Sequence, residues 1–445
     1  MPVSPRLLAV RALVRLDTDA AFAGHAERAR SGDPDAERAA TDLVAGVTRH
    51  RRWLDHILAP FVRGGLVGID GLDAPVRAAL RLGAYELDIA ATAPHAAVGE
   101  AVTAARGAGA GHGAGLVNAV LRRLAEAGPP PDPETGDLAH DLAVRHSHPT
   151  WLVRRWLARF GEAATREILV LDNTRPVFGV RANTLRTAAP VLRAALDTAG
   201  LAFEPSPWVD GLVRTQAVQG LLRAGLVSSG RAVVQDEAAA LVVHVLDPTP
   251  GETVFDVCAA PGGKAVYAAA RMENRGRIVA SDVHEGRLRL VGRAAEATGA
   301  TIIETRAGDV ATRAAEAIAA NDLADAVLVD APCSGTGVLA RRADLRWQRG
   351  EADMQGAAEL QARLLDEASA LVRPGGRLVY STCSIEPEEN ERQIDAFLAA
   401  HPDFARESVA GRVPDAFVTE AGDYAALPHV HATDGAYAAR LRRTA

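Results

Sequence analysis

Three cysteines, Cys258, Cys333 and Cys383, are the residues of this chain best suited to covalent chemistry. An odd and sparse set of cysteines is not typical of a disulfide framework. No two of them have the spacing of a metal-ligand pair, and the 13 histidines are scattered, so no metal site is expected. A free cysteine is most often an inert core residue, and a reactive one needs an exposed setting that favours the thiolate. The place of each cysteine in the fold therefore decides its interpretation.

Two of the cysteines come directly after predicted strands. Cys333 lies in Asp330-Ala-Pro-Cys-Ser-Gly-Thr-Gly337, and Cys383 lies in Tyr380-Ser-Thr-Cys-Ser384. Neighbouring strands are about 4.8 Å apart, so both thiols can enter one pocket if these two strands are neighbours. This placement favours a catalytic thiol over a core residue at both positions. Cys258 lies inside a turn, and we keep the structural interpretation for it.

The segment Phe255-Asp-Val-Cys-Ala-Ala-Pro-Gly-Gly-Lys264 joins a predicted strand to a predicted helix. Gly262 and Gly263 allow a ligand to approach the backbone, and the helix N-terminus offers free N–H groups to an anion. The segment is not a phosphate loop, because Cys258 and Ala265 stand where that motif needs glycine and Ser/Thr. It also lacks the three-glycine spacing of dinucleotide-binding loops. An ordinary tight turn is the alternative, but the position between strand and helix favours a cofactor loop.

Three aspartates, Asp282, Asp309 and Asp330, also follow predicted strands. In parallel α/β folds an acidic residue after the second strand commonly accepts hydrogen bonds from ribose hydroxyls. Each aspartate taken alone could equally be a helix cap or a solvated loop residue. Their recurrence at one edge of the sheet indicates a ligand that contains a nucleoside.

Lys264 is the only lysine, and every other basic residue apart from histidine is an arginine. A compact ammonium on a flexible stem differs chemically from a planar guanidinium. A specific need for the ammonium and chance survival both remain open as explanations of this solitary lysine.

The elements that must position these residues begin at about Val233, where strands and helices alternate. The expected strands are Thr253–Val257, Arg277–Ser281, Thr301–Glu304, Ala326–Asp330 and Arg377–Tyr380. The expected helices are Lys264–Ala270, Glu285–Ala297, Arg313–Ala319 and Asp353–Leu371. The alternation predicts an α/β fold with a mostly parallel, doubly wound sheet, in which ligands bind at the carboxyl ends of the strands.

The rest of the chain has a different character, and 445 residues indicate two or three domains. Apolar residues at helical spacing predict an all-helical section up to about Leu124. The proline-rich segment 128–133 then marks a boundary. A mixed section follows, with a short strand at Val177–Arg181 and a helix at Ala188–Ala199. We therefore expect domains at residues 1–130, 131–230 and 231–445, the second being a small α+β connecting domain.

Composition is that of a globular protein, with 48% hydrophobic and 24% charged residues. Arg11 and Arg15 interrupt the apolar start of the chain, so a signal peptide is not expected, and no apolar run is long enough to span a bilayer. A cytoplasmic protein without a membrane partner is the expectation. The net charge of −7 does not by itself indicate nucleic-acid binding, although a basic groove can coexist with acidic surfaces.

Taken together, these motifs resemble the NOL1/NOP2/Sun family of RNA cytosine-5 methyltransferases. The resemblance rests on the loop that ends at Lys264, the two cysteine motifs and Glu386-Pro-Glu-Glu-Asn390. The helical start of the chain resembles the NusB-like RNA-binding domain, a combination typical of the bacterial RsmB (Sun/Fmu) branch. Further matching segments are Val234-Gln-Asp-Glu-Ala238, Arg341-Arg-Ala-Asp-Leu-Arg-Trp347, Thr433-Asp-Gly-Ala-Tyr437 and Leu116-Val-Asn-Ala-Val-Leu-Arg122.

The resemblance implies a class I, Rossmann-like methyltransferase domain and a role for each candidate residue. Cys383 would be the nucleophile, and Cys333 would assist product release. Asp330 would sit between the cofactor and the base, and Lys264 would help to position the base or stabilise the intermediate. S-adenosyl-L-methionine would be held by Cys258, Ala259, Ala260, Pro261, Gly262, Gly263, Lys264, Asp282 (ribose), Asp309 (adenine) and Asp330.

The implied reaction is methylation of carbon 5 of a cytosine in RNA, with small-subunit (16S) ribosomal RNA as the expected partner and a monomer as the expected state. Carbon 5 is a poor nucleophile until a thiolate adds at carbon 6, which explains the need for Cys383. The base must be unpaired or flipped out of its stack before a thiol can reach it. Two alternatives are an RNA-binding scaffold with a degenerate methyltransferase fold, and a methyltransferase that acts on DNA or on a small molecule.

Overall fold

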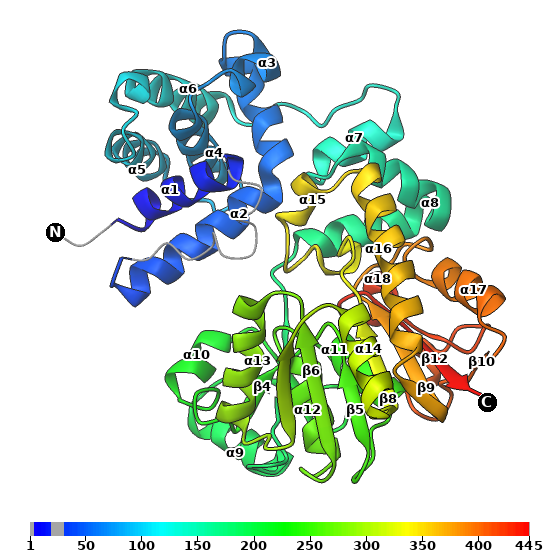
Figure 1. The fold of residues 1–445 in the computed structure, drawn as a ribbon. Helices are drawn as coiled ribbons and strands as arrows, with labels where there is room; N and C mark the ends of the chain where they lie inside the picture. Colours follow the sequence, from blue (N-terminus) through cyan, green and yellow to red (C-terminus); the bar gives the residue numbers. More distant parts are fainter. Residues whose placement is uncertain (1–3, 19–30, 445) are drawn as a thin grey trace. The chain divides into compact units, whose positions relative to one another are not determined.

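The computed structural model describes residues 4–18 and 31–444. The chain forms two compact units, and each unit is built from two separate segments of the sequence. Unit 1 comprises Met1–Thr174 together with Leu339–Gln348, and unit 2 comprises Arg175–Val338 and Arg349–Ala445. Figure 1 shows the elements of both units in chain order.

Unit 1 is helical in its described residues, as the apolar spacing predicts. Its longest element, α2, starts at Pro34 after Asp33, whose side chain accepts from the backbone N–H groups of Asp35 and Ala36. The helices bury one apolar core, to which α1, α2, α4, α5 and α6 contribute most of the side chains. The elements of unit 1 are α1 (Pro5–Thr18), α2 (Pro34–Leu58), η2 (Ala59–Phe61), α3 (Gly65–Asp70), α4 (Ala74–Asp88), α5 (Pro94–Gly107), η3 (Gly111–Gly113), α6 (Ala114–Ala127), α7 (Leu138–Arg145), α8 (Thr150–Asn173) and α15 (Leu345–Gln348).

The segment Leu339–Gln348 is bonded to the rest of unit 1 through Arg346 and Trp347. Arg346 is 2% exposed and donates to the Asn173 side chain at 2.8 Å and to the backbone oxygens of Asp172 and Ser147. Trp347 also donates from its indole nitrogen to the Thr48 oxygen at 2.8 Å. A buried guanidinium needs several acceptors to offset its lost hydration, and these backbone and amide oxygens supply them.

Unit 2 begins with a four-stranded antiparallel sheet in the order β2-β3-β1-β4. The predicted strand and helix of this section are confirmed, and the helices α9 and α10 bury a small apolar core against the sheet. Its elements are β1 (Phe178–Ala182), α9 (Ala189–Thr198), β2 (Glu204–Pro205), β3 (Leu212–Thr215), α10 (Val218–Arg223) and β4 (Ala232–Val234).

The main sheet of unit 2 has the order β10-β12-β9-β8-β5-β6-β7, and β11 pairs with β12. The strands from β9 to β7 are parallel to their neighbours, whereas β12 is antiparallel to β9, β10 and β11. The prediction of a mostly parallel α/β sheet is therefore confirmed. The strands are β5 (Thr253–Asp256), β6 (Arg277–Asp282), β7 (Ile303–Ala307), β8 (Ala324–Asp330), β9 (Val372–Thr382), β10 (Phe404–Arg406), β11 (Tyr424–Ala426) and β12 (Ala436–Arg443).

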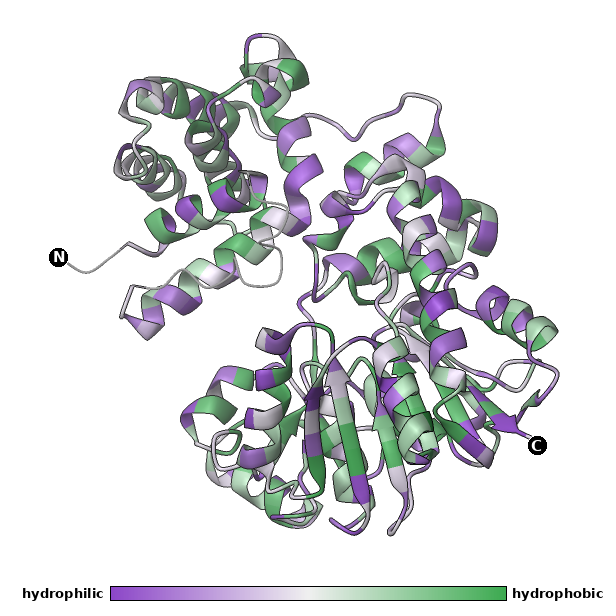
Figure 2. Ribbon diagram, in the orientation of Figure 1, coloured by the Kyte–Doolittle hydropathy of each residue, from purple (hydrophilic) through white to green (hydrophobic). Residues whose placement is uncertain are grey.

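The central strands of this sheet are rich in apolar residues (Figure 2), and helices bury these residues on both faces. Along β8, Leu328 joins the core beneath α11, α12 and α13, and the adjacent Val327 and Val329 join the core beneath α14, α16 and α17. This alternation is the doubly wound arrangement. The helices of this part are α11 (Glu237–Leu246), α12 (Gly263–Arg271), α13 (Glu285–Thr298), α14 (Val310–Ala320), η4 (Thr336–Val338), α16 (Glu351–Ser369), α17 (Glu391–Ala400), η5 (Asp415–Phe417) and α18 (Pro428–His431).

Among the helices of residues 4–18 and 31–444, none combines the length and the apolar character that a membrane span requires.

Candidate active site

The candidate residues gather at one edge of the main sheet. Asp256, Asp282 and Asp330 end β5, β6 and β8, and Thr382, just before Cys383, ends β9. These strands are parallel, and each pairs with the next in the order β9-β8-β5-β6, so their carboxyl ends meet at the same edge. The edge that the sequence predicts as the ligand site is therefore where the chemical groups lie.

The two motif cysteines face each other across the ends of β8 and β9. The Sγ atoms of Cys333 and Cys383 are 3.3 Å apart, and both side chains are half-buried. The hydrogen bond with Cys383 and burial raise the pKa of Cys333 well above its usual value. The strand pairing on which a shared pocket depends is thus present, and one thiol of the pair is held in its protonated form.

Lys264 and Asp330 form an ion pair beside the thiols. The ammonium of Lys264 donates to Asp330 Oδ2 at 2.6 Å, and Ser381 donates its hydroxyl to Asp330 Oδ1 at 2.9 Å. Ser381 is the register partner of Asp330 across β8 and β9, which explains the second contact. Burial alone lowers the pKa of Lys264, but the charge and hydrogen bond of Asp330, with help from Cys383, outweigh it and raise the pKa. Lys264 therefore stays a cation among these acids and thiols.

The glycine-containing loop between β5 and α12 packs tightly against α13 and β6. Gly262 has a φ of +106°, and a Cβ there would lie 3.0 Å from the Val291 Cα, so the position requires glycine. The backbone N–H of Ala259 donates to the Ser281 oxygen at 2.9 Å, which ties the loop to β6. Cys258 is half-buried, and burial raises the pKa of its thiol, as expected for a structural cysteine.

Asp282 and Asp309 make local contacts at the starts of helices. Asp282 is buried and accepts from the His284 backbone N–H at 2.9 Å, ahead of α13. Asp309 is exposed and caps α14 by accepting from the Thr312 backbone N–H at 2.7 Å. That hydrogen bond lowers the pKa of Asp309. Both aspartates therefore also serve as local structural residues, a possibility that the sequence leaves open.

Asp256 belongs to this edge but is not among the residues that the sequence singles out. It is 2% exposed, and neither of its carboxylate oxygens has a hydrogen-bond partner within the described residues. Burial raises the pKa of Asp256 from 3.8 to about 7; Asp330 adds to this effect and Lys264 opposes it. The Cys258 backbone N–H also lowers this pKa but lies outside good hydrogen-bond geometry, so the buried carboxyl is left with unused acceptor capacity, which points to a ligand group. The available signal was its position as the last residue of a strand that leads into the glycine loop.

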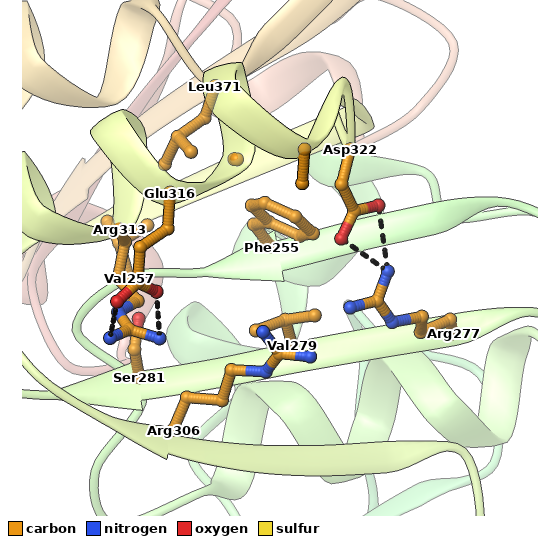
Figure 3. A pocket seen from close by; sticks show the side chains of 12 residues that line it. Phe255, Val257, Arg277, Val279, Ser281, Arg306, Arg313, Glu316, Asp322 and Leu371 are labelled. Atoms are coloured by element: carbon orange, nitrogen blue, oxygen red, sulfur yellow. Dashed lines mark hydrogen bonds and ion pairs between the residues drawn. The ribbon is translucent and has the colours of Figure 1, made fainter.

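A cavity of about 150 Å³ lies on the sheet face that α14 covers (Figure 3). Phe255, Val257 and Val279 line it from the sheet, and ion pairs join Arg313 to Glu316 and Arg277 to Asp322. None of Lys264, Asp330 or the two thiols lines this cavity, so it is separate from the site that they form. Within the part of the chain that the structure describes, no group of three or more His, Cys, Asp and Glu residues could hold a metal ion.

Three segments of the chain match known families in succession. Residues 3–126 match the NusB family, and residues 148–219 match the ferredoxin-like domain of RsmF/B-like methyltransferases. Residues 243–442, which include all the candidate site residues, match the family described as 16S rRNA methyltransferase RsmB/F.

Whole-chain relatives agree with this division. The chain is 33% identical to the probable ribosomal RNA small subunit methyltransferase B of Bacillus subtilis, over 99% of each chain. It is 34% identical to ribosomal RNA small subunit methyltransferase B of Sodalis glossinidius, over 90% of this chain and 88% of that one. The crystal structure of PH0851 matches 99% of each chain at 27% identity and a TM-score of 0.83. A methyltransferase homolog from Pyrococcus horikoshii matches at 28% identity and a TM-score of 0.59, over 69% of this chain and 99% of its own. The chain therefore belongs to the RsmB family of ribosomal RNA small subunit methyltransferases, with a NusB domain and a ferredoxin-like domain ahead of its α/β methyltransferase domain.

Proposed function

We propose that this protein transfers a methyl group from S-adenosyl-L-methionine to carbon 5 of a cytosine in small-subunit (16S) ribosomal RNA. The observation that carries the proposal is the pair of thiols of Cys333 and Cys383, 3.3 Å apart beside the Lys264–Asp330 ion pair. A methyl group can be placed on a nitrogen or oxygen nucleophile without a thiol. Carbon 5 of cytosine, in contrast, becomes reactive only after a nucleophile adds at carbon 6.

The residues at the sheet edge suit S-adenosyl-L-methionine. This cofactor carries an amino group and a sulfonium, and the buried, unpartnered carboxyl of Asp256 offers an acceptor for positive charge. Beside Gly263 the nearest atom that an added Cβ would meet is the Gln235 amide nitrogen at 3.9 Å, so the backbone there leaves room for a ligand, and Asp282 at the end of β6 stands where ribose hydroxyls are usually bound. Asp309 would lie near the adenine. Once bound, the cofactor supplies the methyl group on a sulfonium leaving group.

Replacing Asp256 with asparagine is expected to weaken cofactor binding by about ten- to a hundredfold, because a charge-assisted contact is lost. Since the pKa of Asp256 is about 7, the wild-type affinity should also fall as the pH falls through about 7 and the carboxyl is protonated. Asp256→Asn should not show this pH dependence. Calorimetric titration with S-adenosyl-L-methionine measures both effects without any RNA.

The matched control is Asp322→Asn, which removes a carboxylate paired with Arg277 and away from the sheet edge. Its affinity should equal that of the wild type. Equal affinity in Asp256→Asn would mean that this carboxyl does not contact the cofactor.

Cys383 would act as the nucleophile, through its sulfur, at carbon 6 of the cytosine. The addition makes carbon 5 electron-rich, and carbon 5 then takes the methyl group. A base, either water or a group of the site, takes the carbon-5 proton, and the electron pair of that bond expels the Cys383 sulfur from carbon 6, which restores the aromatic base. Cys333 lies within hydrogen-bond distance of that sulfur, so it is placed to exchange a proton as the sulfur leaves.

Asp330 and Lys264 would act on the base during addition. Asp330 is 30% exposed at its side chain, so it can contact the N3/N4 edge of the cytosine while Ser381 and Lys264 hold its carboxylate in place. The ammonium of Lys264, 18% exposed, is available to stabilise negative charge near the thiols. Both residues are therefore proposed to touch the reacting base.

The RNA substrate is proposed from the relatives, which are named as ribosomal RNA small subunit methyltransferases, and from the matching family, which is named for 16S rRNA. Incubation with labelled S-adenosyl-L-methionine should label 16S ribosomal RNA, offered naked or in small-subunit particles, and should not label transfer RNA or DNA. Bisulfite-resistant cytosines in the labelled RNA would then identify the methylated position. Label in DNA alone would contradict the RNA assignment. Cofactor binding without any label would favour an RNA-binding scaffold.

A further inference from the structure

Each reactive cysteine is followed by a serine, and the two Cys-Ser dipeptides lie side by side. Cys333 faces Cys383 with a sulfur–sulfur distance of 3.3 Å, and Ser334 faces Ser384 with an oxygen–oxygen distance of 3.3 Å. The cysteines are half-buried, whereas the serines are buried. The thiols of the two dipeptides are therefore the accessible groups, and the hydroxyls point into the protein interior.

Glu389 joins the two dipeptides from the buried side. Its carboxylate is fully buried and accepts from both serine hydroxyls through Oε2, with Ser384 Oγ at 2.5 Å. Its Oε1 accepts from the Ser334 backbone N–H at 2.8 Å and from the Gln361 amide at 3.0 Å. All four donors are neutral, and two of them belong to the residue that follows Cys333.

The backbone of Glu389 is fixed as firmly as its side chain. Tyr380 on β9 donates its hydroxyl to the Glu389 oxygen at 2.6 Å. The next residue, Asn390, accepts from Thr382 Oγ1 at 2.6 Å and donates to the Ser384 oxygen at 3.0 Å. Glu389 is therefore anchored to the strand that carries Cys383 and reaches across to the loop that carries Cys333.

We propose that Glu389 is a positioning residue: by binding both Ser334 and Ser384, it holds the two Cys-Ser dipeptides at a fixed position relative to each other and so sets the separation of the two thiols. The inference rests on the proposed function, because it concerns the same two thiols. A carboxylate suits this role since both oxygens only accept, so both serine hydroxyl hydrogens must point towards it and away from the thiols. Its negative charge also helps to keep the pKa of Cys333 high, which favours Cys333 as proton donor over Cys333 as nucleophile.

Two substitutions separate the parts of this role. Glu389→Gln keeps the size of the side chain but puts an amide donor where the serine hydroxyls now donate. Glu389→Ala removes all four hydrogen bonds and should lower kcat by about a hundredfold, the typical effect of a small misplacement of reacting groups. Glu389→Gln should give a smaller loss of kcat. Neither variant should change the affinity for S-adenosyl-L-methionine, because Glu389 does not belong to the proposed cofactor site.

The control is Glu388→Ala, which alters the adjacent acid of the same turn, removes its ion pair with Arg392 and leaves the four hydrogen bonds to the Glu389 carboxylate in place. Its kcat should equal that of the wild type. Ser384→Ala removes one of the two hydroxyl contacts with Glu389 Oε2. Ser384 Oγ also accepts from the Glu386 backbone N–H and contacts Thr336 Oγ1. Only the part of the Ser384→Ala effect that depends on Glu389 should therefore be lost when Ser384→Ala is combined with Glu389→Ala. Melting temperatures of all variants identify any loss of folding.

A second measurement needs neither RNA nor cofactor. Diamide converts two adjacent thiols to a disulfide and takes up their two hydrogens, so its rate with Cys333 and Cys383 reports how they are positioned. The wild type and Glu388→Ala should form this disulfide rapidly, and Glu389→Ala should form it at least about tenfold more slowly. Peptide mass analysis identifies the linked pair and distinguishes it from any product of Cys258.

The outcomes are distinguishable. Folded Glu389 variants with wild-type kcat and wild-type rates of disulfide formation would overturn the positioning role, as would a wild type that forms no such disulfide. If Cys383→Ser kept full activity while Glu389→Ala still slowed disulfide formation, the proposed nucleophile would be wrong and the positioning role would stand. Slower disulfide formation together with a lower kcat in Glu389→Ala supports both the positioning role of Glu389 and the use of the two thiols in the reaction.

Discussion

Replacing Cys383 with serine is expected to reduce methylation of 16S ribosomal RNA by on the order of 10⁴-fold or more, as loss of an attacking nucleophile does in other enzymes. A serine hydroxyl is a far weaker nucleophile than a thiolate at neutral pH, so it cannot add at carbon 6 of the cytosine. Incorporation of labelled methyl groups measures the loss. Covalent capture of RNA by the protein should disappear in the same variant.

Cys258→Ser is the matched control for this result. Cys258 is also half-buried, but it belongs to the loop after β5 and has no role in our proposed chemistry beyond lining the cofactor site. Because it lines the proposed cofactor site, Cys258→Ser should change at most the KM for S-adenosyl-L-methionine, and at saturating cofactor it should retain most of its methylation rate and its covalent capture of RNA. Unchanged methylation by Cys383→Ser, with folding intact, would exclude the adduct that we propose.

Replacing Cys333 with serine should give the opposite phenotype, a covalent protein–RNA complex that accumulates instead of turning over. Its thiol is 3.3 Å from the sulfur that must leave carbon 6, so its removal slows departure and not attack. A complex that resists denaturing electrophoresis and disappears on treatment with ribonuclease measures the adduct. The double variant Cys333→Ser/Cys383→Ser should form none.

The two phenotypes test the assignment of roles as well as the reaction. If Cys383→Ser accumulated the adduct and Cys333→Ser abolished it, then Cys333 would be the nucleophile. That result would fit poorly with the strongly raised pKa of Cys333, which disfavours its thiolate.

Most of the parallel sheet could be predicted from the sequence, because its central strands are buried on both faces and are continuously apolar. Expected and observed strands agree closely for β5, β6 and β8. The expected strand at Thr301–Glu304 lies two to three residues early, because the exposed residues of β7 carry no apolar signal. The strand β12, Ala436–Arg443, was not expected, since Ala, Leu and Arg favour helices. Its pairing with β9 overrides that propensity.

The site was predictable to the extent that its chemistry lies in local motifs. The two thiols, Lys264 and Asp330 each lie at a strand end or in the first turn of a helix, and the sheet brings them together. Asp256 was missed because an acid at the end of an apolar strand is informative only once its lack of partners is known. The role of Glu389 depends on Ser334 and Gln361, which are 55 and 28 residues away in the chain, and no local pattern reveals such contacts.

The discontinuity of unit 1 has a consequence for synthesis on the ribosome. A protein that emerges from its N-terminus usually folds its first domain while the second is still being made. Here the oxygens of Ser147, Asp172 and Asn173 accept hydrogen bonds from Arg346. These hydrogen bonds cannot form until the segment that ends at residue 348 has emerged. At ~5–20 residues per second this interval lasts roughly ten to thirty seconds after residue 174. The nascent chain therefore spends that time with its first unit unfinished, and an N-terminal fragment that ends near residue 174 would keep this defect permanently.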